Sequence, residues 1–189
     1  MRRKLLMLRL LLCRNGYKRA EYLKRKNYFY HQGEHCFFTP YKYGTEPHLL
    51  SFGDNVHVAS GVTFVNHDIA PFMFSYMDPQ NNGNLVKRVG TIEVGNHVFI
   101  GAGSTILYNV KIGNRVIIAA GSLVNCDIPD DGVYAGVPVR KIGEFDNYVE
   151  KCRNFSKAVN WTADENPEEL IEKQINYFWK RSRISGDEG

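Results

Sequence analysis

The sequence lacks the cysteine spacings that mark a disulfide framework or a zinc site. Its four cysteines are far apart, and none of them forms a CxxC or CxxxC pair: Cys13, Cys36, Cys126 and Cys152. Disulfide-rich secreted domains and zinc-binding modules both depend on closely spaced cysteines. The spacing therefore predicts free thiols, no metal site and a protein of the reducing cytoplasm.

Long apolar runs are also missing. The run KLLMLRLLLC at residues 4–13 is interrupted by Arg9, and no small-residue cleavage site follows it. A membrane-spanning helix needs roughly 20 apolar residues, and a signal peptide needs such a cleavage site. The run fits neither of these segments.

Acidic residues are nearly absent from the segment that ends at Lys26, which holds ten Lys or Arg and one Glu. This segment has a net charge of +9, so the rest of the chain carries −5 of the total of +4. Leu5, Leu8 and Leu12 recur at helical spacing, which predicts one basic amphipathic helix within residues 1–27. Such a helix can pack against a neighbouring subunit or lie on the anionic inner face of a membrane. No groove-reading motif accompanies it, which argues against a nucleic-acid partner.

A metal-binding histidine pattern is absent as well. The six histidines do not include two that are five residues apart, the spacing that a β-helical carbonic anhydrase would need: His31, His35, His48, His57, His67 and His97. His31, His35 and Cys36 lie close together, but no second ligand pair matches them. We expect no metal ion.

The sequence does contain a six-residue repeat between Val94 and Ile128. Aliphatic residues recur every six positions, at Val94, Ile100, Ile106, Ile112, Ile118 and Val124. Four residues after each comes a small or β-branched residue: Val98, Ser104, Val110, Val116, Ser122 and Ile128. A period of six fits neither an amphipathic helix nor an alternating strand, and it is typical of a parallel β-helix. A β-sandwich of short strands would instead show turns spaced by roughly 8 to 12 residues.

Three of these units should form one three-sided coil. The segments IGAGSTI from Ile100 and IAAGSLV from Ile118 are three units apart and nearly identical, so they should stack. The same phase occurs at Phe52, Val58 and Phe64 and is then interrupted. We therefore predict a mainly β protein with a β-helix at residues 28–143, whose first coil is imperfect.

Two segments depart from the repeat. Residues 66–91 form an apolar excursion loop, and a loop of this length in a regular solenoid is expected to be functional. Residues 144–189 show two helical patterns, which are predicted to cap the open end of the β-helix. In the second, Asn166 is the expected N-cap and Pro167 stands in the first turn.

Four blocks between residues 45 and 143 resemble the hexapeptide-repeat acyltransferases, in particular the sugar and xenobiotic O-acetyltransferases. In chain order they are TEPHLLSFGDNVHVASGVTFVNHD, VGNHVFIGAGSTIL, VIIAAGSLVNCDIP and AGVPVRKIG. The resemblance implies a left-handed parallel β-helix, a homotrimer with active sites between subunits, and acetyl-CoA bound in a cleft between two subunits. It assigns the coenzyme contacts to Phe99, Gly101, Ala102, Gly103, Ala120, Gly121, Asn125, Pro138, Arg140 and Lys141.

The resemblance also assigns the catalytic role to His67. Transfer of an acetyl group to a hydroxyl requires a base, and a neutral imidazole suits this role at cytoplasmic pH. It also requires N–H donors for the developing oxyanion, and small residues let the backbone approach closely enough to supply them. Asn66 and Asp68 flank His67 and are candidates to orient its ring.

The acceptor stays open at this point. A sugar or glycan precursor is the first hypothesis, because the resemblance is to sugar O-acetyltransferases. Aromatic residues at 28–43 and in the excursion loop can stack on a sugar face or form the core of a trimer. Serine and a streptogramin-type antibiotic are alternative acceptors. The alternative outside enzymes is a non-catalytic β-helix that serves as a scaffold. Such a protein would be expected to lack His67, the small residues at the cleft and the basic residues of AGVPVRKIG, Arg140 and Lys141.

Overall fold

The computed structural model describes residues 2–180 and, for side chains within its helices and strands, residues 6–180. The chain divides into two compact units, one that ends at Phe145 and one that begins at Asp146.

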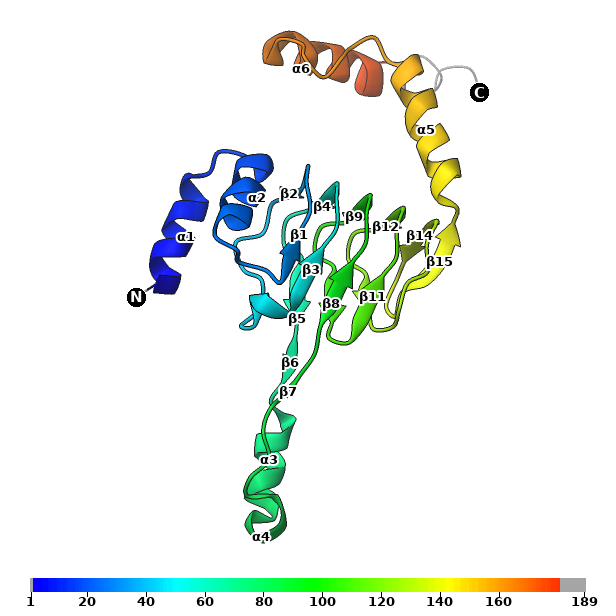
Figure 1. The fold of residues 1–189 in the computed structure, drawn as a ribbon. Coiled ribbons are helices and arrows are strands. Elements are labelled where there is room, and N and C mark those ends of the chain that lie inside the picture. Colours follow the sequence, from blue (N-terminus) through cyan, green and yellow to red (C-terminus); the bar gives the residue numbers. More distant parts are fainter. Residues whose placement is uncertain (1, 181–189) are drawn as a thin grey trace. The chain divides into compact units, whose positions relative to one another are not determined.

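The first unit is a β-helix whose short strands stack into three parallel sheets (Figure 1). One sheet contains β1 (His31–Gln32), β3 (Leu50–Phe52), β8 (Ile92–Val94) and β11 (Val110–Ile112). The second contains β2 (Phe37–Phe38), β4 (Val56–Val58), β9 (Val98–Ile100), β12 (Val116–Ile118), β14 (Gly132–Ala135) and, antiparallel at its edge, β15 (Arg140–Gly143). The third contains β5 (Thr63–Val65), β10 (Thr105–Leu107) and β13 (Leu123–Val124).

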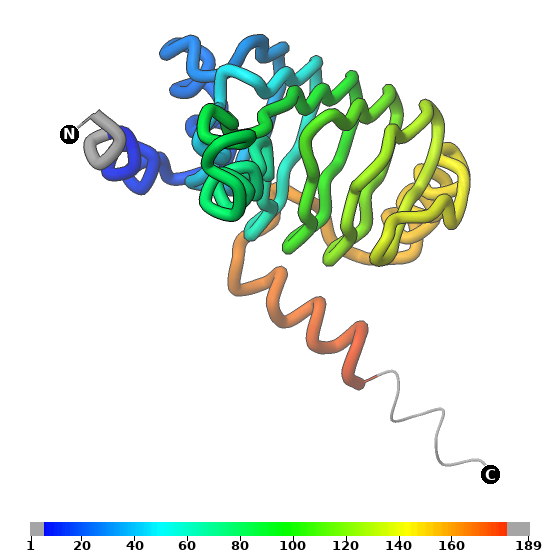
Figure 2. The backbone as a smooth tube through the Cα atoms, turned by 90° about the horizontal axis from the view of Figure 1, so that it is seen from below, coloured from blue at the N-terminus to red at the C-terminus, as the bar shows by residue number. Residues whose placement is uncertain are grey.

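Strand register confirms the predicted coil length. Ile100 pairs with Ile118, and Ile106 pairs with Val124, so each residue pairs with its equivalent three repeat units later. All twelve repeat positions from Val94 to Ile128 are buried, with at most 4% of each residue exposed. Successive coils are visible as parallel rungs in Figure 2. The repeat therefore forms the core, because each aliphatic residue lies above its equivalent one coil away.

The first coil is imperfect, as predicted. Its paired residues are 20 positions apart, as in His31 with Ser51 and Phe38 with Val58, whereas β9 and β12 of the later coils pair residues that are 18 apart. Aromatic rings fill the wider interior: the ring centroids of Phe29 and Phe52 are 4.9 Å apart. A short 3-10 helix, η1 (Pro47–Leu49), leads into β3.

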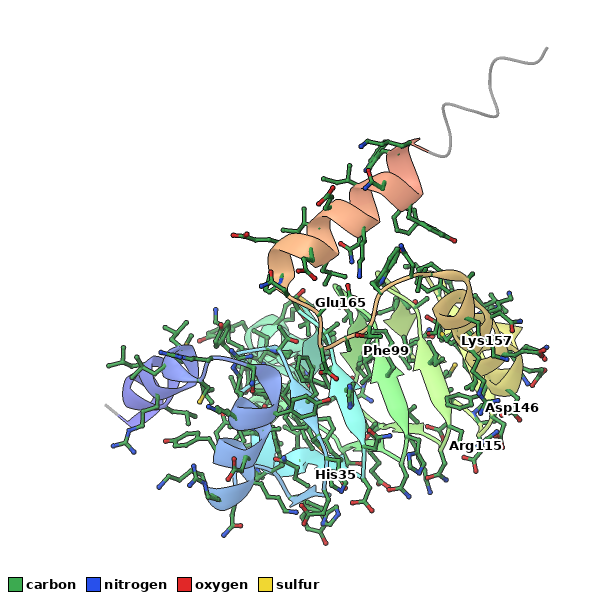
Figure 3. The ribbon with its side chains drawn as sticks, turned by 90° about the horizontal axis from the view of Figure 1, so that it is seen from above. His35, Phe99, Arg115, Asp146, Lys157 and Glu165 are labelled. Carbon is green, nitrogen blue, oxygen red and sulfur yellow. The ribbon has the colours of Figure 1, made fainter. Side chains whose placement is uncertain are left out.

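One edge of the solenoid is a column of residues in the left-handed backbone region. Their φ angles are 56° at His35, 53° at Asn55, 57° at His97, 55° at Arg115 and 61° at Asp131. Figure 3 shows the labelled His35 and Arg115 along this edge. Beside this column, four side-chain oxygens each accept a hydrogen bond from a backbone N–H of the preceding coil, at distances of 2.7 to 2.9 Å. They belong to Asp54, Asn96, Asn114 and Asp130. These ladders stabilise the sharp corners, where Asn and Asp tolerate positive φ.

The N-terminal segment forms two helices, so the prediction of a single helix was wrong. They are α1 (Arg2–Leu12) and α2 (Gly16–Arg25). The chain breaks at Asn15, whose side chain accepts a hydrogen bond from Lys18 N at 2.9 Å and so caps a new helix. Leu10 of α1 and Leu23 of α2 are fully buried in the core of the first coil. Both helices therefore pack on their own chain's β-helix.

The excursion begins and ends as a two-stranded antiparallel ribbon. Strand β6 (His67–Asp68) pairs with β7 (Arg88–Val89). Between them lie α3 (Ala70–Met77) and α4 (Pro79–Asn82), and the whole segment projects away from the coils (Figure 1). Phe64 still pairs with Ile106, so the excursion adds residues without changing the phase of the repeat.

The second unit consists of helices. They are α5 (Phe145–Ala158, beginning at the last residue of the first unit), α6 (Pro167–Ile175) and the π-helical turn η2 (Asn176–Lys180). Asn166 is the N-cap of α6, as predicted, and its Oδ1 accepts from Glu168 N at 2.9 Å. Whether these helices cap the β-helix stays a prediction, and residues 181–189 lie outside the described part.

Candidate active site

His67 lies where the chain leaves the third sheet for the excursion. It pairs with Val89 in the β6–β7 ribbon, and Gly90 N donates to Asn66 O at 3.2 Å. The His67 side chain is 30% exposed. Its Nδ1 atom is 3.0 Å from Glu46 Oε2 and 2.9 Å from Thr45 Oγ1. The ribbon thus fixes the backbone of His67, and the segment before η1 supplies the partners of its ring.

Glu46 is a buried carboxylate with its side chain only 9% exposed. Burial raises the pKa of Glu46, but hydrogen bonds from Lys87 Nζ and Thr45 Oγ1, with the charges of Lys87 and His67, outweigh it and bring this pKa to about 2. Lys87 stands on the limb of the excursion that returns to β7. Glu46 is therefore ionised at neutral pH and can only accept hydrogen bonds.

This arrangement decides which nitrogen of His67 carries the proton. The Thr45 hydroxyl donates its hydrogen to Glu46 Oε2, so Thr45 Oγ1 offers Nδ1 a lone pair. Both partners of Nδ1 are acceptors, and Nδ1 must therefore be the protonated nitrogen. In the neutral imidazole, Nε2 then holds the lone pair that can take a proton.

The two residues beside His67 have other roles than contact with its ring. Asp68 Oδ1 accepts from Ala70 N at 2.8 Å, at the start of α3. Asn66 is fully buried, and its Nδ2 donates to the backbone oxygen of Glu46 at 2.7 Å. Asn66 therefore acts on His67 through Glu46, because it holds the backbone of that residue in place.

Thr45, Glu46 and Lys87 were missed as functional residues in the sequence. Thr45 and Glu46 open the block TEPHLLSFGDNVHVASGVTFVNHD, so the signal was present in a segment already singled out. Nothing local connects Lys87 with Glu46, which is far from it along the chain. Only the ribbon brings the two together.

Five of the predicted coenzyme contacts form one corner of the solenoid, between the second and third sheets. Gly101 is buried there. The two residues that follow it are exposed, and so are their equivalents one coil later: Ala102, Gly103, Ala120 and Gly121. Gly103 and Gly121 have φ angles of +70° and +71°, and a Cβ on either would meet nothing within 4 Å. A Cβ on Gly101 would lie 2.4 Å from Ala120 N. The corner is thus tightly packed on its inner side and open on its outer side. A ligand can therefore contact the backbone of the protein there.

The other predicted coenzyme contacts lie elsewhere on the unit. Phe99 is at the centre of β9, 42% exposed, between His57 and Ile117 in the register (Figure 3). Asn125 follows β13 and is exposed, as are three residues near β15: Pro138, Arg140 and Lys141. Lys141 Nζ pairs with Glu144 at 2.8 Å, and this hydrogen bond raises the pKa of Lys141.

His67 and the small-residue corner lie at opposite ends of the third sheet. Gly61, the corner residue level with Gly103, precedes β5, whereas His67 follows it. The extended stretch between them spans up to roughly 20 Å. One chain therefore does not bring its own His67 and its own corner together, and a shared reaction centre requires the His67 edge of another copy.

A cavity of about 460 Å³ lies at the first coil, next to the partners of His67. Its walls come from α1, the segment before η1, and β5: Leu6, Met7, Tyr28, Tyr41, Lys42, Tyr43, Gly44, Thr45, Val62, Thr63 and Phe64. Thr45 belongs both to this cavity and to the hydrogen bonds of the imidazole. The wall is mostly apolar and aromatic, with the Lys42 side chain and the Thr hydroxyls as polar groups, which is the usual make-up of a small-ligand site.

A family model described as "Bacterial transferase hexapeptide (six repeats)" matches residues 91–126. CapG of Staphylococcus aureus is 39% identical over 122 residues, which are 63% of this chain and 68% of that protein. YvoF of Bacillus subtilis (strain 168) is 33% identical over 111 residues, which are 59% of this chain and 57% of that protein.

Among solved structures, the chain is similar to the hexapeptide-repeat-containing acetyltransferase VCA0836 from Vibrio cholerae O1 biovar eltor, which was crystallised with acetyl coenzyme A. The TM-score is 0.57 at 21% identity, over 76% of this chain and 85% of that one. At this identity the likeness concerns the fold, which is the left-handed parallel β-helix predicted for residues 28–143.

Proposed function

The chain belongs to the hexapeptide-repeat acyltransferase family, and from this premise we propose that it transfers an acetyl group from acetyl-CoA to a hydroxyl of a sugar or glycan precursor. The observation that carries the proposal is the His67 ring, whose Nδ1 proton is held by Glu46 and Thr45. The free cysteines fit a reaction in the reducing cytoplasm.

His67 is the general base. Its Nε2 takes the proton of the acceptor hydroxyl as the oxygen attacks the thioester carbonyl, and the imidazolium then returns a proton to the leaving thiolate. Glu46 is a positioning residue, because its charge holds Nδ1–H and stabilises the imidazolium. Two hydrogen bonds keep Glu46 in place: Lys87 Nζ donates to its Oε1 atom, and Asn66 Nδ2 donates to its backbone oxygen.

The small-residue corner is where the coenzyme arm fits. The backbone is exposed at Ala102, Gly103, Ala120 and Gly121. The two glycines have no Cβ, and the two alanines add one methyl group each, so a ligand can approach the backbone closely. Backbone N–H groups at such a corner stabilise negative charge on a carbonyl oxygen. Phe99 offers an exposed ring to the coenzyme arm, and Arg140 and Lys141 offer positive charge to its phosphates.

The active unit is a homotrimer, with each site formed between two copies. The separation of His67 and the corner within one chain supports a site that is shared between copies. It also accounts for the exposed apolar side chains of the excursion, since Ile69, Met73 and Met77 are 59%, 56% and 72% exposed. Apolar surface of this kind marks an interface.

A sugar is the acceptor that the cavity supports best. Tyr28 and Tyr41 line it, and aromatic faces stack on sugar rings through their apolar sides. Thr45 lines the cavity and contacts Nδ1 of His67, so the cavity lies next to the ring, while the reacting hydroxyl has to reach Nε2 at the other edge of the imidazole. Serine is a small, fully polar acceptor and would leave this apolar wall without contacts.

Release of CoA from acetyl-CoA, measured with a thiol reagent against free sugars, nucleotide sugars, serine and a streptogramin, tests the proposal. We expect acceptor-dependent release with at least one sugar, and an O-acetyl signal in the product by NMR. Faster release with serine or the streptogramin than with every sugar would overturn the sugar assignment. Binding of acetyl-CoA without release on any acceptor, including hydroxyl-bearing lipids and glycans, would favour the scaffold alternative.

A further inference from the structure

Helix α1 has apolar residues on two sides. Leu10 is fully buried in the core of the first coil. Leu8, Leu11 and Leu12 are 56%, 57% and 73% exposed. Residues at these spacings share one face of a helix. The second side therefore presents a row of leucines that nothing in the described part of the chain covers, and we call it the leucine face.

Arg19 of α2 fixes the position of α1. This side chain is 5% exposed. Its guanidinium donates to Phe38 O at 2.8 Å and to Thr39 O at 2.9 Å on the β2 side, and to Leu10 O and Cys13 O, both at 3.4 Å, at the end of α1. One buried cation thus ties the last turn of α1 to the first coil. The leucine face is held outward by this bonding and is not a frayed end.

The two N-terminal helices carry exposed positive charge. Exposed cations on α1, α2 and their flanks are Arg9, Arg14, Lys18, Arg25 and Lys26. Glu21 is the one acidic residue from Met1 to Lys26, against ten Lys or Arg. Exposed leucines among exposed basic residues are the combination by which a helix binds in the plane of an anionic lipid surface.

We propose that the leucine face, with these five cations, docks the protein on an anionic lipid bilayer. The leucines enter the boundary between headgroups and acyl chains, and the cations contact lipid phosphates. Helix α1 has 11 residues, so it lies on the membrane. Over the described residues, no helix is long and apolar enough to cross a bilayer. Leu6 and Met7 of the same helix line the cavity beside Thr45, so the helix that docks is also part of the wall of that cavity.

Sedimentation with vesicles tests the proposal. The full chain is mixed with vesicles of phosphatidylcholine alone or with phosphatidylglycerol added. We expect binding only to the anionic vesicles, with a loss of at least about tenfold as the salt concentration is raised from about 0.05 M to about 0.5 M. The variant L8S/L11S/L12S should reduce binding at least about tenfold, because three exposed apolar side chains no longer enter the lipid.

Matched controls separate docking from general stickiness. The variant I171S/I175S removes two exposed apolar residues from α6, and K151E/K157E reverses two exposed charges on α5. Both should bind vesicles like the wild type. The three replaced leucines are exposed, so circular dichroism of L8S/L11S/L12S should match the wild type.

Two results would overturn the proposal. One is equal binding of the wild type and L8S/L11S/L12S to anionic vesicles. The other is that the wild type binds no vesicles while L8S/L11S/L12S has a different mass by light scattering. The leucine face would then be a contact between copies. Vesicle binding by a protein that transfers no acetyl group would contradict the proposed function alone.

Discussion

The position of one proton on His67 follows from three neighbouring side chains. Glu46 is ionised and accepts, and the Thr45 hydroxyl donates its hydrogen to Glu46. Nδ1 therefore carries the proton, and Nε2 keeps the lone pair that the proposed general base requires. Lys87 completes the arrangement with a hydrogen bond to the other carboxylate oxygen of Glu46.

Replacement of Glu46 by Gln should change how stability depends on pH. The pKa of Glu46 is about 2 in the folded protein and 4.5 ordinarily. A depressed pKa adds stability that is fully present above pH 4.5 and is lost as pH falls toward 2. Glu46→Gln should therefore lower the free energy of unfolding at neutral pH by about 2 kcal/mol, the scale of hydrogen bonds to a charged group. The difference from the wild type should shrink in acid, which thermal melts across this pH range would show.

The same variant should lower kcat more than it raises KM, because the ring loses its orientation while the binding surfaces remain. Glu46→Asp should recover less of kcat than of stability, since the shorter carboxylate still meets Lys87 but reaches Nδ1 poorly. A Glu46→Gln protein with the wild-type kcat and the wild-type pH profile would show that the carboxylate has no part in positioning His67.

The sequence was sufficient to propose His67 as the base, but not to find the residues that contact its ring. Its block matched a motif, whereas Glu46 and Lys87 are far apart along the chain and meet through the β6–β7 ribbon. Asn66 and Asp68 were reasonable candidates by adjacency. Adjacent residues on an extended stretch point in opposite directions, so both neighbours of His67 point away from its ring. Asn66 is buried, and Asp68 accepts a hydrogen bond from Ala70 N at the start of α3.

At the scale of elements, the period of six was sufficient to predict the strands and their buried positions. Each unit of the repeat is local, so Ile100 and Ile118 specify their own stacking. The N-terminal helices were harder, because Leu5, Leu8 and Leu12 continue at helical spacing up to the break. Asn15 and Gly16 carry the signal for two helices: Asn is a preferred N-cap, and Gly16 is buried too close to Phe37 for a Cβ.

A substitution at the small-residue corner should separate coenzyme binding from folding. Gly103→Ala adds a methyl group where nothing lies within 4 Å, at a φ of +70°. We expect a stability loss of about 1 kcal/mol from the left-handed backbone. The KM for acetyl-CoA should rise about tenfold, because the methyl group enters the space of the coenzyme.

Ile106→Val is the matched control for Gly103→Ala. It removes one methyl group from a fully buried position and costs about 1 kcal/mol without touching the corner. Its KM for acetyl-CoA should equal that of the wild type. If both variants changed KM equally, the corner would not be the coenzyme site.

At the scale of the whole molecule, the proposed active site requires an assembly, because His67 and the corner are separated within one chain. One chain has a mass of 21.7 kDa, and light scattering should give about three times this value. Met73→Ser with Met77→Ser should shift the protein toward monomer and lower turnover in parallel, because these residues are exposed on the excursion. Full turnover by a stable monomer would contradict the shared site.

The kcat of His67→Ala, measured beside its affinity for acetyl-CoA, tests the central claim most directly. The side chain is 30% exposed and lies outside the aliphatic columns, so the variant should fold. Removal of a positioned proton-transfer group should lower kcat by about 10² to 10⁴, while the Kd for acetyl-CoA stays near that of the wild type. Turnover close to the wild-type value with the true acceptor would contradict both the assignment of the base and the mechanism built on it.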